Sequence, residues 1–341
     1  DQETRDEIVA RLFDEKPPEV FLHGFDRPNI HLAFDAKDQP RRQILGFADG
    51  RRGQSGIVYC ATRARTETLA RALSDAGHVA CHYHGGMEAE DRRIVETRFQ
   101  QDDGLIVVAT IAFGMGVDKP DIRWVAHADL PKSIEAYYQE IGRAGRDGAP
   151  AETLTLYGPD DIRLRRAQID EGLAPPERRM ADHARLNTLL GLAEALKCRR
   201  QVLLGYFGEA PGPCGNCDLC DKPPEVFDGT LAVRKALSAI LRTGKDYDKR
   251  QWQAIFRQMM GHDLVRPDPE RHGALRMTEN ARPILRDEAG IDLRRDALTA
   301  AGLRRPAVKA MVSDENAPLL SALKAKRRAL AEAARVPAYV I

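Results

Sequence analysis

The sequence lacks a surplus of charge of either sign, a long apolar run and a phosphate-binding loop. Its 52 Lys and Arg against 51 Asp and Glu give a net charge of +1, so any nucleic-acid surface must be local. No apolar run approaches the roughly 20 residues that span a membrane, which predicts a cytoplasmic protein without a membrane partner. The 341 residues contain no G-x-x-x-x-G-K-[ST] motif and no D-E-x-H box, so this chain is not expected to hold Mg²⁺ and ATP by itself.

Short β-rich runs alternate with helix-like segments between residues 56 and 157. The expected strands are GIVYC (56–60), VACHY (79–83), LIVVAT (105–110), IRWVAHAD (122–129) and ETLTLY (152–157), with helices at 63–77, 88–100 and from 133. Strands that are apolar on both faces and alternate with helices predict one α/β domain with a parallel sheet. Ligands of such sheets bind beyond the carboxyl ends of the strands. The loops at 61–63, 84–86, 110–116 and 139–150 are therefore expected near one edge.

The chain becomes helical after residue 158, and a third region follows. The helix KRQWQAIFRQMMGH precedes the strand candidates LVRP and ALRMT, and this order is the back half of a winged helix. The segment that would form the front half of the winged helix is too short in this sequence. Either the wing domain is reduced, or residues 244 and 245 are not neighbours in the native chain. These patterns divide the sequence into 1–27, 28–157, 158–228, 229–290 and 291–341, where one more helix begins near residue 319.

Four of the six cysteines lie between residues 198 and 220. Cys214, Cys217 and Cys220 have C-x2-C-x2-C spacing, and Cys198 lies sixteen residues earlier. Such knuckles supply thiolates to tetrahedral Zn²⁺, and a closed site of four thiolates is structural rather than catalytic. An iron–sulfur cluster can use the same four thiolates, and independent buried thiols or a disulfide pair are further alternatives. The other two cysteines, in apolar strands, are expected to be core residues.

The stretch QEIGRAGRDGAP (139–150) places Arg143 and Arg146 three residues apart among glycines. Arginines at one helical turn's spacing, with little steric cover, are suited to grip a compact anion such as a phosphate. The alternative is a basic helix end followed by a glycine turn, with the arginines near the negative end of the helix dipole.

Six stretches occur in an order that is typical of one family. They are FDRPNI (25–30), GIVYCATRAR (56–65), YHGGM (83–87), VVATIAFGMGVDKPDIRWVAHADLP (107–131), YYQEIGRAGRDG (137–148) and CRRQVLLGYFGE (198–209) before CGNCDLC. Together they resemble the second motor lobe and zinc-binding region of RecQ-family DNA helicases, over about residues 1 to 290. The resemblance implies a RecA-like lobe, a helical zinc-binding subdomain and a partial winged helix. The last helix resembles the start of that family's HRDC domain.

The resemblance also implies roles for individual residues. Arg143 and Arg146 match arginines that reach the γ-phosphate of ATP, with Gln139, Gly116 and Asp118 near the nucleotide. The residues expected to contact DNA are Thr62, Arg63, His84, Gly85 and Thr110 in the motif loops, and Arg266 and Arg276 in the wing region. His84 has an ordinary alternative as a turn residue between a strand and a helix, and the other histidines receive no role.

The function implied is an ATP-dependent 3′ to 5′ DNA helicase of repair and recombination, monomeric, acting on single strands and duplex junctions at the bacterial nucleoid. The first motor lobe is missing and residues 1–27 resemble its tail, so this chain is expected to be a part of that enzyme and inactive alone. A non-catalytic DNA-binding or adaptor module is the rival interpretation, and an RNA helicase is a third. The paired arginines discriminate against a pure binding module, which has no need of γ-phosphate contacts.

Overall fold

The computed structural model describes residues 24–113, 118–239, 249–267 and 275–295, with isolated positions before residue 19 and after residue 321. The proposed discontinuity at residues 244 and 245 lies outside the described residues, as does Gly116. The positions described between 322 and 333 are helical. In the described part of the chain, no helix combines the length and the apolar character needed to cross a membrane.

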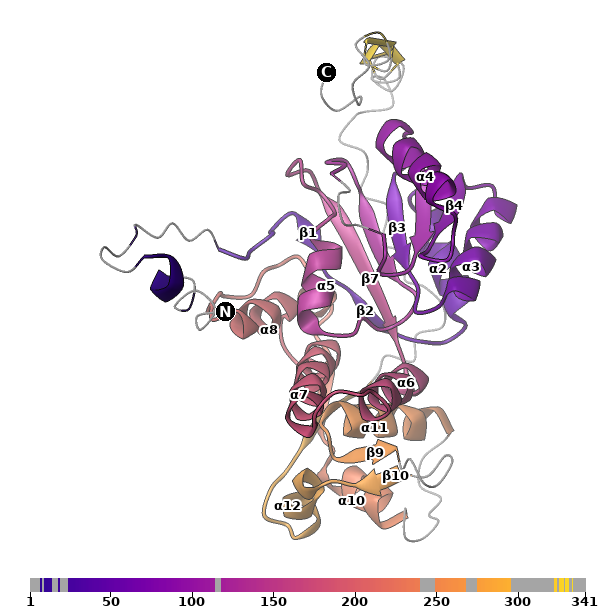
Figure 1. Ribbon diagram of the computed structural model, residues 1–341. Coiled ribbons are helices and arrows are strands. Elements are labelled where there is room, and N and C mark those ends of the chain that lie inside the picture. Colours follow the sequence, from indigo (N-terminus) through magenta and orange to yellow (C-terminus); the bar gives the residue numbers. More distant parts are fainter. Residues whose placement is uncertain are drawn as a thin grey trace.

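One parallel sheet forms the first part of the molecule, as the sequence predicts (Figure 1). Its strands run in the order β1-β7-β6-β3-β5-β4, and β2 also pairs with β7. The strands are β1 (Ile30–His31), β2 (Phe34–Ala36), β3 (Gly56–Tyr59), β4 (Ala80–Tyr83), β5 (Ile106–Ala109), β6 (Trp124–His127) and β7 (Ala151–Tyr157). Because β3, β5 and β6 are central, their residues are almost fully buried on both faces.

Helices cover both faces of the sheet because successive strand residues point to opposite sides. On one face α2 (Pro40–Asp49) and α3 (Arg63–Asp75) pack on a cluster that includes Val58 and Trp124. On the other face α4 (Ala89–Gln101) packs on a cluster that includes Ile57 and Tyr59. Trp124 leaves no room at Gly56, where an added Cβ would lie 2.1 Å from the indole ring. The central strand therefore requires glycine at this position.

The loops after β3, β4 and β5 share the carboxyl edge of the sheet, but the arginine loop, residues 142–149, does not. The helix α5 (Ile134–Ile141) begins after β6 and leads to a loop whose backbone bonds to residues that precede β6. Gly145 N–H donates to Ile122 O at 2.8 Å, and Asp147 N–H donates to Pro120 O at 3.3 Å. The backbone of this loop does not join the others at the carboxyl edge, because α5 carries the chain back to the amino end of β6; only the Arg143 side chain reaches Tyr59 at the end of β3.

The helical and wing regions follow the sheet. Their elements are α6 (Pro159–Asp170), α7 (Pro176–Ala193), α8 (Arg199–Tyr206), α9 (Asp218–Asp221), β8 (Glu225–Asp228), α10 (Thr230–Ala239), α11 (Lys249–Gly261), β9 (Val265–Pro267), β10 (Leu275–Met277), the 3₁₀ helix η1 (Glu279–Ala281), α12 (Arg282–Leu285) and β11 (Asp292–Arg295). The antiparallel hairpin β9–β10 follows α11, which is the back half of a winged helix. In Figure 1, α6 and α7 lie between the sheet and the wing region.

A buried carboxylate joins the sheet, the helical region and the wing. Glu194, directly after α7, is 2% exposed and pairs with Arg257 of α11 at 2.6 Å and with Arg294 of β11 at 3.2 Å. Arg294 also donates a hydrogen bond to the hydroxyl of Tyr157, the last residue of β7. Because two buried guanidinium groups share this carboxylate, its removal leaves both charges in a low-dielectric interior.

Replacing Glu194 by Ala is expected to lower the free energy of unfolding by about 3 to 5 kcal/mol, the usual cost of removing one partner of a buried ion pair. Urea denaturation followed by circular dichroism measures the change. Glu279→Ala, at an exposed carboxylate that pairs with Arg282 on the surface, is the matched control and should cost less than about 1 kcal/mol. Equal midpoints for the two variants would show that Glu194 does not hold the regions together.

Candidate functional site

The arginine loop brings together two residues that the sequence assigns to the nucleotide. Arg146 Nη1 donates to Asp118 Oδ1 at 2.6 Å, and both side chains are more than one third exposed. Arg143 is half-buried and faces Tyr59 at the end of β3. Burial raises the pKa of the Tyr59 hydroxyl, and the nearby positive charge of Arg143 opposes that rise. Gln139 lies exposed on α5. The Arg146 side chain is thus partly exposed, and the Arg143 side chain lies against the sheet.

Two residues that the sequence analysis gave no role hold the arginine loop in place. Arg27 donates to the carbonyls of Gly142, Ala144 and Gly145 at 2.9 to 3.1 Å. Asn29 Nδ2 donates to the carbonyls of Gly145 and Ala149 at 2.8 and 2.9 Å. Orphan carbonyls at the end of a helix need such donors. Both residues lie in the FDRPNI stretch that carries the family resemblance, but the carbonyls that they contact lie more than 110 residues away in the sequence.

Glycine is required at position 145 of the arginine loop. Its φ of +57° lies in the left-handed region, and an added Cβ would come within 2.5 Å of Asn29 Nδ2 and 2.8 Å of Ala149 O. A side chain there would displace the donor that fixes the loop. Gly145 therefore serves close backbone packing beside the arginines.

A buried histidine supports α5 beneath the arginine loop. His127 of β6 is fully buried, with Nδ1 3.0 Å from Thr155 Oγ1 and Nε2 3.0 Å from Glu140 Oε2. Its ring stacks on Tyr59 at 5.5 Å. Both ring nitrogens have partners, so His127 is a structural residue of the core.

The loops at the carboxyl edge present small and basic residues to solvent. Thr62 caps α3, its Oγ1 accepting from Arg65 N–H at 3.4 Å, and Arg63 is exposed next to it. Gly85 is exposed and has open space around its Cα. Thr110 is half-buried and its N–H donates to Tyr83 O at the end of β4. These positions form one row along the ends of β3, β4 and β5.

His84 does not present its imidazole to this row. The side chain is 7% exposed, with Nε2 3.0 Å from Glu67 Oε1. Nδ1 accepts a hydrogen bond from Gly86 N–H at 3.2 Å, which closes the turn after β4. The interpretation of His84 as a turn residue fits this geometry, and the DNA-facing interpretation does not.

Asp129 fixes the loop that follows β3, and the sequence gave no sign of this role. Its carboxylate accepts from Ala61 N–H at 2.9 Å, from Lys37 Nζ at 2.8 Å and from Arg65 Nη1 at 2.7 Å. Burial raises the pKa of Asp129, but the charge and hydrogen bond of Lys37, together with the Ala61 N–H, hold the pKa below its usual value. Lys37 also pairs with Asp161 at 2.6 Å, so the cluster of two cations and two anions is neutral.

The two wing arginines face each other across the β9–β10 hairpin but differ in their contacts. Arg266 makes a two-pronged contact with Asp263, with Nε and Nη2 each 2.7 Å from a carboxylate oxygen. Arg276 is exposed. Of this pair, Arg276 is the one with a solvent-facing side chain, while Arg266 fixes the start of the hairpin.

The four cysteines form a compact set. Their Sγ atoms all lie within 4.8 Å of one another, and the separations 198–214, 198–217 and 214–220 are 3.4, 3.9 and 4.0 Å. Four Zn–S bonds of about 2.3 Å place tetrahedral sulfur atoms about 3.8 Å apart. The separations exceed a disulfide bond, and a cluster of several iron atoms would hold its thiolates further apart. Burial raises the pKa of Cys198, but hydrogen bonds from the N–H groups of Gln201 and Cys214 and from the thiols of Cys214 and Cys220 together lower the pKa to about 7.

The cysteine knuckle, residues 214–221, is fastened to the sheet. Asp218 N–H donates to Leu32 O at 2.9 Å, and the Asp218 carboxylate accepts from Phe34 N–H at 3.0 Å. Arg199, next to Cys198, is 1% exposed and donates to both oxygens of Asp218 at 2.9 Å. Hydrogen bonds made by residues next to the ligating cysteines orient the thiolates around a metal.

Three family models match the chain in succession. The helicase conserved C-terminal domain matches residues 38–148, the RecQ zinc-binding domain matches residues 159–221, and the RQC domain matches residues 243–301. The first match and the parallel sheet define the lobe as a RecA-like helicase lobe. The second match and the cysteine geometry together indicate a structural zinc.

Comparison with curated proteins shows which helicases this chain is similar to. The chain is 35% identical to the ATP-dependent DNA helicase RecQ of Pasteurella multocida, over 100% of this chain and 59% of the relative, and 35% identical to that of Haemophilus influenzae, over 100% and 61%. The RecQ-like DNA helicase BLM of Xenopus laevis is 39% identical over 56% of this chain and 14% of its own length. The chain belongs to the RecQ family of DNA helicases. It spans about 60% of the length of its bacterial relatives.

One Zn²⁺ per chain is the expected result of elemental analysis on the purified protein. Metal binding to a site that is absent from the unfolded chain contributes on the order of 10 kcal/mol to local folding. Cys217→Ser should therefore remove the metal and lower solubility, because Cys217 is fully buried against the sheet. Cys81→Ser, outside the cluster, is the control and should keep one Zn²⁺. Iron, or no metal, in the unsubstituted protein would contradict the assignment.

Arg27→Ala is expected to release the arginine loop without unfolding the sheet. The carbonyls of Gly142 and Ala144 lose the Arg27 donor and that of Gly145 keeps only Asn29, so amide hydrogen exchange of residues 142–149 should rise at least about tenfold while exchange in β5 and β6 stays unchanged. Mass spectrometry of the exchanged peptides measures both. Arg93→Ala, at an exposed arginine of α4, should change neither. Unchanged exchange in the loop would show that Arg27 does not fix it.

Proposed function

We propose that the protein is an ATP-dependent 3′ to 5′ DNA helicase and that this chain supplies its second motor lobe, zinc-binding subdomain and winged-helix region. The observation that supports this proposal is the arginine loop, which five hydrogen bonds from Arg27 and Asn29 hold, with Arg146 partly exposed beside Asp118. A rigidly placed arginine stabilises charge on a transferring phosphoryl group, because no reorganisation is needed at the moment of reaction. A module that only binds DNA has no use for such a loop.

The ion pair of Arg146 with Asp118 can be exchanged for a contact between Arg146 and another anion. Both groups are exposed, so the pair contributes little to stability and can be broken by a stronger anion. A γ-phosphate in the cleft between two motor lobes would compete for the same guanidinium. Bound ATP and Mg²⁺ would supply the phosphoryl group and its charge neutralisation, and a phosphate loop outside these 341 residues must hold them.

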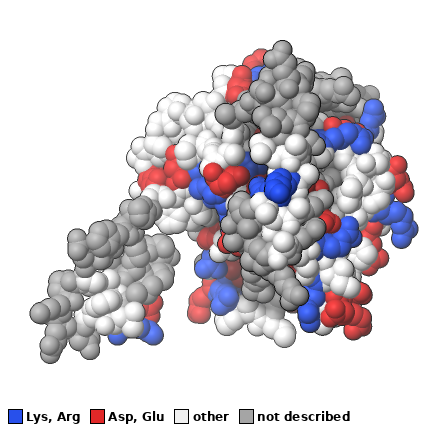
Figure 2. Space-filling model, turned by 90° about the horizontal axis from the view of Figure 1, so that it is seen from above, with Lys and Arg blue, Asp and Glu red and all other residues white. Residues whose placement is uncertain are grey.

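The DNA contacts are proposed to run along the carboxyl edge of the sheet, through Thr62, Arg63, Gly85 and Thr110, with Arg276 on the wing. Small hydroxyls and loop amides bind phosphates without reading bases, which a translocating enzyme requires. Figure 2 shows Lys and Arg mixed with Asp and Glu on one face, in keeping with a local rather than general basic surface. A monomer acting on single strands and duplex junctions at the bacterial nucleoid is the form we propose.

The two rival functions predict different behaviour. An adaptor that keeps the fold without catalysis would bind DNA equally well whether or not Arg146 is present and would lack ATPase activity in any context. An RNA helicase would prefer RNA to DNA strands of the same length. The RecQ-type zinc and RQC regions favour DNA as the substrate.

The test uses two proteins: this chain alone, and the same chain joined to a phosphate-loop lobe from its own gene. This chain alone should show no ATPase above background, and the longer protein should show DNA-stimulated ATPase and unwind duplexes with a 3′ overhang but not a 5′ overhang. In the longer protein, Arg146→Ala should lower kcat by about a hundredfold or more and leave nucleotide affinity within a few fold, because the lost contact forms mainly in the transition state.

Arg163→Ala is the matched control, since Arg163 is an exposed arginine of α6 paired with Asp160. It should leave kcat unchanged. If Arg146→Ala retains full turnover, or this chain alone hydrolyses ATP, the phosphate role of the arginine loop is wrong. Unwinding of the 5′ overhang alone would overturn the proposed polarity.

A further inference from the structure

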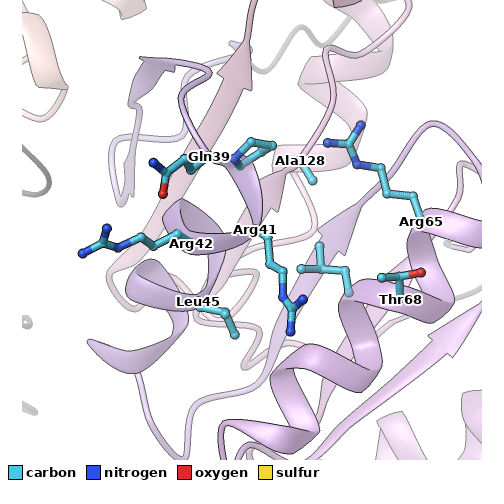
Figure 3. Close-up of a pocket in the computed structure, with 9 residues that line it drawn as sticks. Gln39, Arg41, Arg42, Leu45, Arg65, Thr68 and Ala128 are labelled. Atoms are coloured by element: carbon cyan, nitrogen blue, oxygen red, sulfur yellow. The ribbon is translucent and has the colours of Figure 1, made fainter.

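A cavity of about 420 Å³ opens between the first turns of α2 and α3. Its floor is apolar and includes Leu45, Leu69 and Ala128, while Arg41, Arg42 and Arg65 lie around it. Figure 3 shows Arg41 and Arg65 projecting from the two helices on either side of this space, with Arg42 directed away from α3. None of the described residues that line the cavity is acidic.

The charges at the start of α2 are placed against the helix dipole. Arg41 and Arg42 occupy the second and third positions of the helix, where cations are unfavourable, and no acidic residue lies in that turn. The residue before the helix, Gln39, has a left-handed φ of 56° and makes no side-chain cap. Pro40 has no N–H, and the N–H groups of Arg42 and Gln43 donate to Gln39 O. The start of α2 therefore carries two cations in an unfavourable field, which a bound anion would relieve.

The neighbouring helix repeats the pattern. The first turn of α3 holds Arg63 and Arg65 and no acidic residue, whereas the first turns of α4, α5 and α6 each carry Asp or Glu. Asp129 neutralises Arg65, but among the described residues neither Arg41 nor Arg42 makes an ion pair. The excess positive charge beside the cavity comes from these two side chains.

The cavity continues the row of proposed DNA contacts. At Gly86, an added Cβ would meet the Arg63 guanidinium at 2.8 Å, so Arg63 reaches toward the loop after β4. Arg65, two residues on, reaches the other way, to Asp129 and the cavity. The first turn of α3 thus links the loop after β4 with the cavity beside α2. A strand that lies along Gly85, Arg63 and Thr62 has the cavity next in its path.

We infer that this cavity is a nucleotide subsite for single-stranded DNA, in which Arg41 binds a backbone phosphate and the apolar floor takes the sugar or base of the same nucleotide. The inference rests on the proposed DNA-binding function and extends it beyond the motif loops. An acidic peptide is the competing occupant by charge alone. The continuity with Arg63 and Thr62 favours DNA.

The experiment measures binding of fluorescein-labelled dT20 to the purified chain over a range of salt concentrations. Arg41→Gln should weaken binding at least about fivefold at low salt and flatten the slope of log affinity against log salt by about 0.7, the value for one phosphate contact on a single strand. Its thermal midpoint should stay equal or rise, because the substitution removes a charge that opposes the helix dipole. Arg41→Lys should keep the slope, since it keeps the charge.

Two further variants separate this inference from the proposed function. Arg63→Gln tests the motif loops, and Arg93→Gln, at an exposed arginine on α4, is the control that should change nothing. If the unsubstituted chain does not bind dT20, the DNA-binding function fails and the subsite fails with it. If Arg63→Gln weakens binding but Arg41→Gln matches Arg93→Gln, the subsite alone is wrong. The subsite is also wrong if Arg41→Gln abolishes binding of a labelled Glu- and Leu-rich decapeptide while dT20 affinity is unchanged.

Discussion

The extended segment from Phe25 to Phe34 is the constraint on which both ends of the candidate site depend. On one side Arg27 and Asn29 hold the carbonyls of the arginine loop. On the other side the carbonyls of Pro28 and Leu32 accept hydrogen bonds from Asn216 and Asp218 of the cysteine knuckle. Because nearby residues of one short segment contact both elements, the zinc site and the arginine loop are mechanically connected through a few covalent bonds. A metal that orders the cysteine knuckle therefore also orders the segment that carries Arg27 and Asn29.

A second connection joins the sheet to the wing through Glu194. The carboxylate is surrounded by guanidinium groups from α11 and β11, and Tyr157 at the end of β7 bonds to one of them. Ion pairs buried in this way add little net stability over apolar packing, but they tolerate few alternative arrangements of their partners. The zinc knuckle and the Glu194 cluster therefore fix the position of two regions relative to the same sheet, one by metal ligation and one by charge.

The sequence could predict features whose cause is local. The strands β3 to β7 are short apolar runs, and the cysteine spacing limits the metal geometry, so the sequence alone predicts both. The position of the arginine loop depends on the path of α5 across the sheet, which no local pattern encodes. The burial of His84 depends on Glu67, seventeen residues earlier, and the role of Arg27 depends on carbonyls 115 to 118 residues later. Contacts over such separations follow from the fold and not from the motif.

The two arginine-bearing surfaces differ in how their charges are held, and the difference matches their proposed roles. The arginine loop is fixed by hydrogen bonds to its backbone before any ligand arrives, which suits a group that must stabilise a transition state without reorganising. The arginines at the starts of α2 and α3 oppose the helix dipoles, each at about 0.3 to 1 kcal/mol, so an anion bound there relieves an unfavourable field. That relief is electrostatic and weakens with salt. A motor that moves along DNA needs contacts that form and release in every cycle, and rigid, deeply buried phosphate sites would hold the strand in place.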